Sequence, residues 1–311
     1  MRIVVALGGN ALSPGRGTGS AEEMRFALVA TARSLVELVV AGVQVVVTHG
    51  NGPQVGRILL QQEAAAPGVP PMPMDVCGAE SQGQIGYLLV QALDAELRRR
   101  GRAERALCLV TQVVVDGRDP AFRRPTKPVG PLVDAATASQ VAAESGHVFG
   151  PQPDGRWRRV VPSPLPVGLV EEPLLASLVE AGHLVVAAGG GGVPVVDVGT
   201  RWRGVEAVVD KDRTAALLGE LVGAQQLLLL TEVASVQVGY GTSAARSLTS
   251  LSVAQARGLL ARGEFPEGSM GPKVAACCDF VERTGGAARI AALADAAAAV
   301  TGDGGTVFTP D

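Results

Sequence analysis

Short, continuous apolar runs recur along this chain, and longer segments with a helical spacing of apolar residues separate them. Such runs are typical of strands that are buried on both faces, whereas a strand with one wet face alternates apolar and polar positions. The runs that we expect to form strands are residues 3–7, 43–47, 107–115, 184–188, 226–230, 287–291 and 306–309. Strands that alternate with helices predict an α/β fold whose sheet is largely parallel and covered on both faces.

Local signals mark where several helices begin. Ser20 with Glu23, and Ser252 with Gln255, have the spacing of a capping box, in which each side chain accepts a hydrogen bond from the other residue's backbone N–H. The first box opens a helix with apolar residues on one face, and the second opens a helix that runs to about residue 262. Further helices are expected to about residue 63 and over residues 78–100, 173–181, 212–221 and 272–283.

Residues 116–166 differ in composition from the rest of the chain. Nine prolines in this stretch exclude long helices, although residues 134–144 could form a short one. Asp154 and Gly155 are typical of a hairpin turn between two short strands. We therefore expect residues 116–166 to form an inserted lid subdomain, called the flap below, which carries Lys127.

Composition fits a soluble enzyme. A length of 311 residues predicts one large or two medium domains, and 47% hydrophobic residues can fill a core. The net charge of −3 gives no reason to expect a nucleic acid as partner. No apolar run reaches the ~18 residues that a membrane span requires, and no signal peptide is evident. Four cysteines without a CxxC pair and three scattered histidines predict a reducing, cytoplasmic location and no metal site built by the protein.

Only three of the 27 basic side chains are lysines, namely Lys127, Lys211 and Lys273. Each lies in a segment that is expected to be a loop or the end of an element. A lysine ammonium is a compact point charge that can contact one phosphate oxygen, whereas arginine presents a planar fork. Drift in a GC-rich genome is one explanation of the bias. The other is a phosphoryl-transfer site on which three ammonium groups converge.

Glycine-rich turns follow three of the expected strands, at residues 8–9, 50–52 and 189–192. Ligands of parallel sheets bind at the carboxyl ends of the strands, and glycine lets backbone N–H groups approach an anion closely. Glycine also serves tight packing, but three such turns at equivalent strand ends favour an anion site. A Walker-type NTPase and a Rossmann dehydrogenase are both disfavoured, because no lysine follows a glycine and residues 50–56 do not fit G-x-G-x-x-G.

The motifs, taken together, resemble those of the carbamate kinases. The matching segments run in order through nearly the whole chain: VALGGNAL at 5–12, HGNGPQVG at 49–56, DVCGAESQG at 75–83, PTKPVGP at 125–131, RRVVPSP at 158–164, AAGGGGVPVV at 187–196, GVEAVVDKD at 204–212 and GSMGPK at 268–273. The resemblance implies an open αβα sandwich of the amino-acid-kinase type, a homodimer, and ATP-linked interconversion of carbamate and carbamoyl phosphate. It also implies Mg²⁺ carried on the phosphates of ATP or ADP. Residues 1–200 would form a carbamate lobe with the flap inserted, and residues 201–311 a nucleotide lobe.

The same resemblance assigns roles to individual residues. The phosphoryl group and carbamate would be held by two glycine-rich turns, Gly8, Gly9 and Asn10 with Gly50, Asn51 and Gly52. Lys127 would reach over from the flap, Lys211 and Lys273 would bridge the phosphates, and Asp212 would orient the lysines. The nucleotide would also contact Glu232, Ser269 and Met270. Glu232 departs from the family, which usually has Asp there, and Ala234-Ser235 replaces the usual Asp-Gly.

Catalysis by such a site needs positioning and charge neutralisation more than proton transfer. Carbamate is already an anionic oxygen nucleophile, so its attack on a γ-phosphoryl group requires no general base. We therefore expect His49 to support the turn at residues 50–52 by hydrogen bonding and not to act as a base. Two alternatives stay open at this point: another acyl-phosphate or nucleotide kinase, such as an acetylglutamate or uridylate kinase, and a non-catalytic ligand-binding relative. The pathway, whether arginine, purine or agmatine breakdown, also stays open.

Overall fold

A computed structural model describes residues 1–12, 19–266 and 269–311. Its largest sheet has eight strands in the order β15-β17-β16-β12-β1-β2-β9-β3. Their bounds are β1 Arg2–Leu7, β2 Gln44–His49, β3 Ala106–Cys108, β9 Leu184–Val186, β12 Gln226–Thr231, β15 Ser250–Ser252, β16 Ala287–Ala292 and β17 Thr306–Thr309. Within this sheet only the β16–β17 pair is antiparallel among the described strands. The expected α/β fold with a mainly parallel sheet is therefore confirmed.

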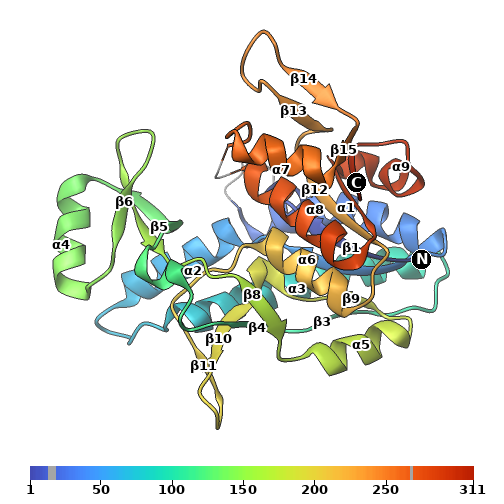
Figure 1. Cartoon of the computed structure of the whole chain (residues 1–311). Coiled ribbons are helices and arrows are strands. Elements are labelled where there is room, and N and C mark those ends of the chain that lie inside the picture. The colour runs from blue at the N-terminus through green and yellow to red at the C-terminus, as the bar shows by residue number, and fades with distance from the viewer. Residues whose placement is uncertain (13–18, 267–268) are drawn as a thin grey trace.

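Helices cover both faces of this sheet (Figure 1). Strand β1 explains why: Ile3, Val5 and Leu7 belong to one buried cluster, whereas Val4 and Ala6 belong to another. The first cluster includes buried side chains of α1 (Ala21–Val40), α3 (Met74–Arg99) and α9 (Ala296–Thr301), and the second those of α5 (Glu172–Glu180), α6 (Lys211–Leu221), α7 (Val253–Ala261) and α8 (Met270–Thr284). Successive residues of a strand point to opposite faces, so a continuous apolar run fills two cores at once.

One expected strand, residues 107–115, is wrong. The chain forms two strands there, β3 in the large sheet and β4 (Gln112–Val115) in a second sheet of order β11-β10-β4-β8. The break falls at Thr111, whose backbone N–H donates to Gln82 Oε1 at 2.9 Å and whose carbonyl accepts from Gln82 Nε2 at 3.1 Å. A side chain of α3 thus satisfies the backbone at the point where the chain changes sheets. The other strands of this sheet are β8 Pro166–Leu169, β10 Val193–Asp197 and β11 Trp202–Gly204.

The flap stands apart from the body of the molecule, at the left of Figure 1. It contains a three-stranded antiparallel sheet of β5 (Lys127–Val133), β7 (Trp157–Val161) and β6 (Phe149–Pro151), together with α4 (Ala135–Ser145). The hairpin turn expected at Asp154 and Gly155 joins β6 to β7, and Gly155 has a φ of +81° that favours glycine. The inserted subdomain, its short helix and its hairpin are therefore confirmed as structure.

Helix starts agree with the local signals. Both capping boxes form, at Ser20 with Glu23 and at Ser252 with Gln255. Helix α2 spans Gly52–Ala65, and α3 begins at Met74, four residues before its expected start. Sequence reasoning missed α9, strands β5, β8, β10, β11 and β15, and the hairpin of β13 (Val236–Val238) and β14 (Arg246–Leu248), which projects at the top of Figure 1. None of the helices in the described ranges is long and apolar enough to cross a membrane.

Candidate active site

Two glycine-rich turns lie side by side at the carboxyl end of the large sheet. The N–H of Gly8 donates to Leu230 O at 2.9 Å, and the N–H of Gly50 donates to Leu7 O at 3.1 Å, so each turn is tied to the neighbouring strand. A Cβ on Gly8 would lie 3.0 Å from Leu230 O, which leaves little room for any side chain. Gly9 begins a short 3-10 turn, Gly9–Ala11. The side chain of Asn10, an expected ligand, lies outside the described part of the structure.

The third glycine-rich turn, residues 189–192, packs against the second. Gly190 has a φ of +69°, and a Cβ there would lie 2.2 Å from Asn51 Nδ2, so glycine is required on both counts. Asn51 itself donates to Ser81 Oγ of α3 at 2.7 Å. This contact fixes the expected ligand Asn51 through a residue that sequence reasoning did not single out as part of the site. Its signal was present, since Ser81 lies inside the segment DVCGAESQG.

A left-handed alanine holds this third turn in place. Ala188 has a φ of +53°, a conformation that costs energy for any residue with a Cβ. Two buried threonines compensate through its backbone: Thr48 Oγ1 donates to Ala188 O at 2.9 Å, and Ala188 N donates to Thr111 Oγ1 at 3.0 Å. Sequence reasoning could not find this arrangement, because the three residues are far apart along the chain.

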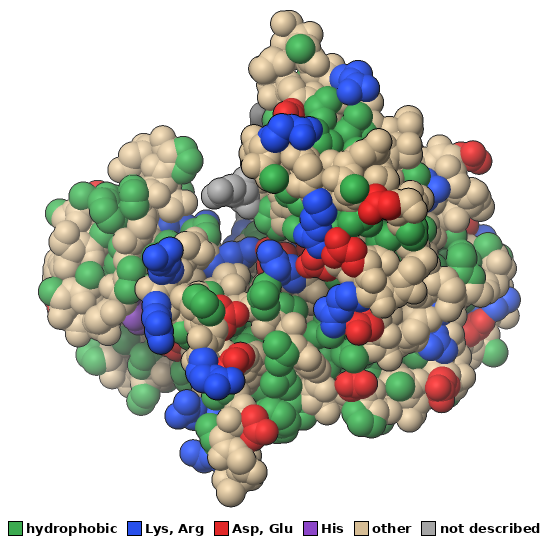
Figure 2. All heavy atoms as spheres, viewed as in Figure 1, with side chains coloured by type: hydrophobic (Ala, Val, Ile, Leu, Met, Phe, Trp, Pro, Cys, Tyr) green, Lys and Arg blue, Asp and Glu red, His purple; other side chains and the backbone are tan. Residues whose placement is uncertain are grey.

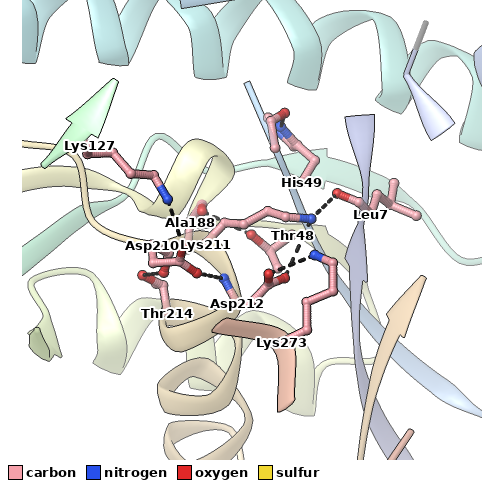
Figure 3. A network of polar contacts seen from close by, with 11 residues as sticks. Leu7, Thr48, His49, Lys127, Ala188, Asp210, Lys211, Asp212, Thr214 and Lys273 are labelled. Carbon is pink, nitrogen blue, oxygen red and sulfur yellow. Dashed lines mark hydrogen bonds and ion pairs between the residues drawn. The ribbon is translucent and has the colours of Figure 1, made fainter. Parts of the chain in front are cut away.

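Lys211 and Lys273 converge on Asp212 (Figure 3). Lys273, in the first turn of α8, donates through Nζ to Asp212 Oδ2 at 2.8 Å, and Lys211 Nζ lies 3.6 Å from Asp212 Oδ1. Lys211 also donates to Leu7 O, the last carbonyl of β1, at 2.7 Å. The Asp212 side chain is only 5% exposed. The expected role of Asp212, to hold both ammonium groups in register, agrees with these contacts.

Lys127 reaches the same group of charges from the flap. Its Nζ donates to Asp210 Oδ2 at 2.7 Å, across 83 residues of sequence. Asp210 Oδ1 accepts from the N–H of Asp212 at 3.0 Å and so caps helix α6. Sequence reasoning did not assign Asp210 to the site, although an aspartate directly before a helix that begins with Lys211 and Asp212 was a visible signal.

Burial and opposite charges act against each other in this cluster. Burial lowers the pKa of Lys211, while the carboxylate of Asp212 opposes that shift. Burial alone would raise the pKa of Asp210, but the charge of Lys127 and its hydrogen bond outweigh burial, and the pKa of Asp210 is lowered. Three ammonium groups face two carboxylates, which leaves one net positive charge. An excess of positive charge in a partly dry site suits a multiply charged anion such as a phosphate.

Three hollows adjoin these charges, and Lys273 lines all of them. The flap hollow is lined by Gly50, Asn51, Gly52, Lys127, Arg158 and Asp210, with Lys211 beside them. The inner hollow is lined by Gly8, Gly9, Lys211, Thr231 and Glu232. The outer hollow is lined by Thr231, Glu232, Tyr240, Ser269 and Met270. Figure 2 shows the cleft between flap and body, with basic and acidic side chains on its floor.

The expected ligands line different hollows, which have Lys273 in common. The turn at residues 50–52 lines the flap hollow, whereas Glu232 and Met270 line the outer hollow. Ser269 touches both the flap hollow and the outer hollow. Gly8 and Gly9 line the inner hollow, next to Lys211, and not the flap hollow that contains the other glycine turn. Gly268, part of the resembling segment at 268–273, lies outside the described residues.

His49 supports the second glycine turn, as expected. Its Nδ1 lies 2.8 Å from Gly50 O, and because a carbonyl only accepts, Nδ1 carries the proton. Burial lowers the pKa of His49 to about 4, so the ring is neutral at pH 7. A Cβ on Gly189 would lie 2.4 Å from His49 Nε2, so the imidazole is enclosed between two of the turns. His49 lines none of the three hollows, so the buried ring is not placed to act as a base.

The fold and the lysine cluster define a phosphotransferase, and comparison with known proteins specifies the family. The family model described as "Amino acid kinase family" matches residues 1–292, and the chain belongs to that family. Carbamate kinase from Pyrococcus furiosus is 47% identical over 311 residues, which cover 99% of each chain. Carbamate kinase from Halobacterium salinarum is 47% identical over 309 residues, 99% of this chain and 98% of the relative.

Solved structures give the same result. A crystal structure from Aeropyrum pernix K1 superposes with a TM-score of 0.96 at 40% identity, over the full length of both chains. Carbamate kinase from Giardia lamblia bound to AMP-PNP superposes with a TM-score of 0.94 at 38% identity, and covers 100% of this chain and 98% of that one. The resemblance to the carbamate kinases, which rested on eight short segments, is thereby confirmed over the whole chain.

Proposed function

We propose that this chain is an ATP:carbamate phosphotransferase that reversibly converts ATP and carbamate into ADP and carbamoyl phosphate. The observation that carries the proposal is the convergence of all three lysines of the sequence, Lys127, Lys211 and Lys273, on one pair of aspartates at the carboxyl end of the sheet. The full-length similarity to carbamate kinases supports the choice of carbamate as acceptor.

The residues that line the hollows support separate binding positions for the nucleotide and for carbamate, with the lysines between them. We place ADP or ATP across the outer and inner hollows, against Glu232, Ser269 and Met270, with its terminal phosphates at Lys211 and Lys273. Carbamate is placed on the flap side, against Gly50, Asn51 and Gly52, and the glycine turn at residues 8–10 serves the transferred group. This division agrees with the proposed nucleotide lobe (residues 201–311) and carbamate lobe (residues 1–200), which share the large sheet through the parallel pair β1–β12.

Transfer between these positions needs no proton acceptor. The carbamate oxygen attacks the γ-phosphorus while the bridging oxygen to ADP leaves, and the ammonium groups neutralise charge on the phosphoryl oxygens. Lys211 and Lys273 are held by Asp212, so their positions are set before the substrates bind. Such preorganised donors cost no reorganisation during the reaction, and losing one typically costs about 3–4 kcal/mol of barrier.

The nucleotide would bring Mg²⁺ with it. Asp210 and Asp212 both accept from lysines, so their carboxylates are already engaged, and Mg²⁺ favours phosphate oxygens with several retained waters. We therefore assign Mg²⁺ to the phosphates of ATP, whose analogue AMP-PNP is bound in the Giardia lamblia structure. We further propose a cytoplasmic homodimer. The four free cysteines of the chain are compatible with a reducing compartment.

The test is formation of ATP from carbamoyl phosphate and ADP in a coupled assay, followed by a single-turnover measurement with enzyme in excess. We expect Mg²⁺-dependent ATP formation that EDTA abolishes. Acetyl phosphate in place of carbamoyl phosphate, and N-acetylglutamate or UMP as acceptors from ATP in the opposite direction, should give far lower rates. A folded protein that binds ADP but transfers no phosphoryl group in a single turnover would instead be a ligand-binding relative. Preference for N-acetylglutamate or UMP would identify another kinase of the family.

A further inference from the structure

Asp210 is bonded to the flap and to the body of the molecule at the same time. Its Oδ2 accepts from Lys127 Nζ at 2.7 Å, and its Oδ1 accepts from the N–H of Asp212 at 3.0 Å (Figure 3). The Asp210 side chain is 15% exposed, and that of Lys127 is 36% exposed. One carboxylate therefore connects the flap lysine to the first turn of α6, the turn that contains Lys211 and Asp212.

The charges explain why such a connection is needed. Lys211 and Lys273 already share Asp212, and both line the hollow that Lys127 enters. A third ammonium that approaches this pair without a counter-charge is repelled, since like charges at close range disfavour each other in a partly buried site. The carboxylate of Asp210 supplies the missing counter-charge at the point where Lys127 arrives.

We propose that Asp210 is a positioning residue, which holds Lys127 at the edge of the phosphoryl site so that the third ammonium is in place when substrates bind. The inference rests on the proposed function for its kinetic effects, but the contact itself does not depend on it. An ammonium has three donors, and the bond to Asp210 uses one, so two can still meet phosphoryl oxygens. Asp210 itself touches no substrate in this scheme and acts through Lys127.

A purely structural role for Asp210, as the cap of α6, is the competing explanation, and chemistry separates the two. Asparagine and serine cap helices about as well as aspartate, but neither carries the charge that binds Lys127. Other contacts also attach the flap here: Val208 N donates to Pro162 O at 2.9 Å, and Arg159 pairs with Glu206 at 2.7 Å. Loss of the Asp210 charge should therefore release the Lys127 side chain without detaching the flap.

The first experiment is a double-mutant cycle in the coupled assay with Asp210→Asn, Lys127→Ala and the double variant. We expect Asp210→Asn to lower kcat by roughly tenfold or more, with the KM for ADP changed less than about threefold, because ADP lies on the other side of the lysines. In the Lys127→Ala background the same change should alter kcat by less than about twofold. If Asp210→Asn lowers kcat by the same factor in the Lys127→Ala background as in the native enzyme, or does not lower it in the native enzyme, the proposal is wrong.

Asp134→Asn is the matched control. Asp134 also caps a helix, α4 in the flap, through the N–H of Thr137 at 2.8 Å, and among the described residues it pairs with no lysine. We expect its activity to match that of the native enzyme. Asp210→Ser, which keeps a capping oxygen, is the second variant should Asp210→Asn fold poorly, as judged by circular dichroism and thermal unfolding.

A second measurement needs no activity and so separates failure of this inference from failure of the proposed function. Three lysines and one N-terminal amine make trace acetylation, read by peptide mass spectrometry, simple to assign. With the terminal amine as reference, Lys127 should label about threefold or more faster in Asp210→Asn, because its amine is no longer held in a charge-assisted hydrogen bond. Labelling of Lys127 that is the same in native, Asp210→Asn and Asp134→Asn proteins contradicts the proposal, whatever reaction the enzyme catalyses.

Discussion

Asp212→Asn is the substitution that tests most directly how the lysines are held. Asparagine has nearly the same shape and keeps one oxygen that can accept from Lys273, so the change removes charge and little else. In the native protein Oδ2 accepts from Lys273 Nζ at 2.8 Å, and Oδ1 lies 3.6 Å from Lys211 Nζ. We expect a folded protein with strongly reduced turnover.

The contacts set the size of the effect. With an effective dielectric constant of about 20, the attraction of a unit charge at these two distances is about 6 and about 5 kcal/mol before desolvation is subtracted. Removal of one partner of a buried ion pair typically costs about 3–5 kcal/mol of stability, because the other charge is left buried and unpaired. The 5% exposure of the Asp212 side chain places it in that class. If about 3 kcal/mol falls on the transition state, kcat decreases on the order of a hundredfold.

The pH dependence gives a second, independent expectation. Burial lowers the pKa of Lys211, and Asp212 is the main group that opposes this. Turnover needs Lys211 charged, so activity is lost as the pH rises through that pKa. Asp212→Asn removes the opposing charge, and the alkaline limb of kcat should move to lower pH. The acid limb should stay where it is, because Asp212 accepts no proton in the reaction.

The assay is ATP formation from carbamoyl phosphate and ADP between pH 5.5 and 10, on the order of one measurement per half pH unit, with thermal unfolding of the same samples. The control is Asp279→Asn, which removes a carboxylate of α8 that pairs with Arg257 of α7 at 2.6 Å. The control should keep turnover and pH profile close to native. Near-native turnover of Asp212→Asn would refute the argument that this carboxylate organises the lysines, and a displaced acid limb would show that it acts as a base.

Three further predictions concern the lysines, the flap and His49. Lys211→Arg and Lys273→Arg should each lower kcat on the order of a hundredfold while folding normally, because a planar fork cannot occupy an ammonium's position; near-native turnover would show that generic charge suffices. Removing residues 116–166 with a glycine bridge should nearly abolish phosphoryl transfer, and Lys127→Ala alone should lower kcat on the order of a hundredfold, while both leave ADP binding, measured by calorimetry, intact; near-native activity in either would contradict a catalytic flap. Burial lowers the pKa of His49 in the folded protein to about 4 from 6.5. As the pH falls from 6.5 to about 4, His49 is protonated in the unfolded chain but not in the folded protein, so the free energy of unfolding decreases. In urea unfolding, the free energy of unfolding of His49→Gln should decrease less at low pH than that of the native protein, by up to about 3 kcal/mol. An unchanged dependence of the unfolding free energy on pH would disprove this prediction.

The large sheet could be anticipated because its strands carry their own signal. A strand buried on both faces must be apolar at every position, and β1, β2 and β12 meet that condition in runs that are visible without any structure. The strand expected over residues 107–115 is apolar except at Thr111 and Gln112, and the expectation of one continuous strand was wrong. At its division, Thr111 hydrogen-bonds to the side chain of Gln82, 29 residues earlier, while the Thr111 carbonyl also accepts from Val193 N of the second sheet at 2.9 Å.

The candidate site shows the same contrast. Lys127, Lys211 and Lys273 could be selected from the sequence because lysine is so rare in it, and the turns at residues 50–52 and 189–192 because glycine follows an apolar run. Asp210 had only the weaker signal of its place beside Lys211 and Asp212, since an aspartate before a helix is also an ordinary cap. Its contact with the flap appears only when residues 83 apart in sequence are brought to 2.7 Å.

The sequence by itself therefore determined the class of fold, the inserted flap, the identity of the lysines and the family, because each of these is written in residue type and in spacings of a few positions. The tertiary structure decided which carboxylate each ammonium meets, that Ala188 adopts a left-handed conformation between two threonines, and that the glycine turns line separate hollows on either side of Lys211. The physical reason is the distance along the chain over which each effect acts. Propensity and periodicity act over one or two turns of chain, whereas ion pairs and buried hydrogen bonds join whatever residues the packed layers place within about 3 Å of each other.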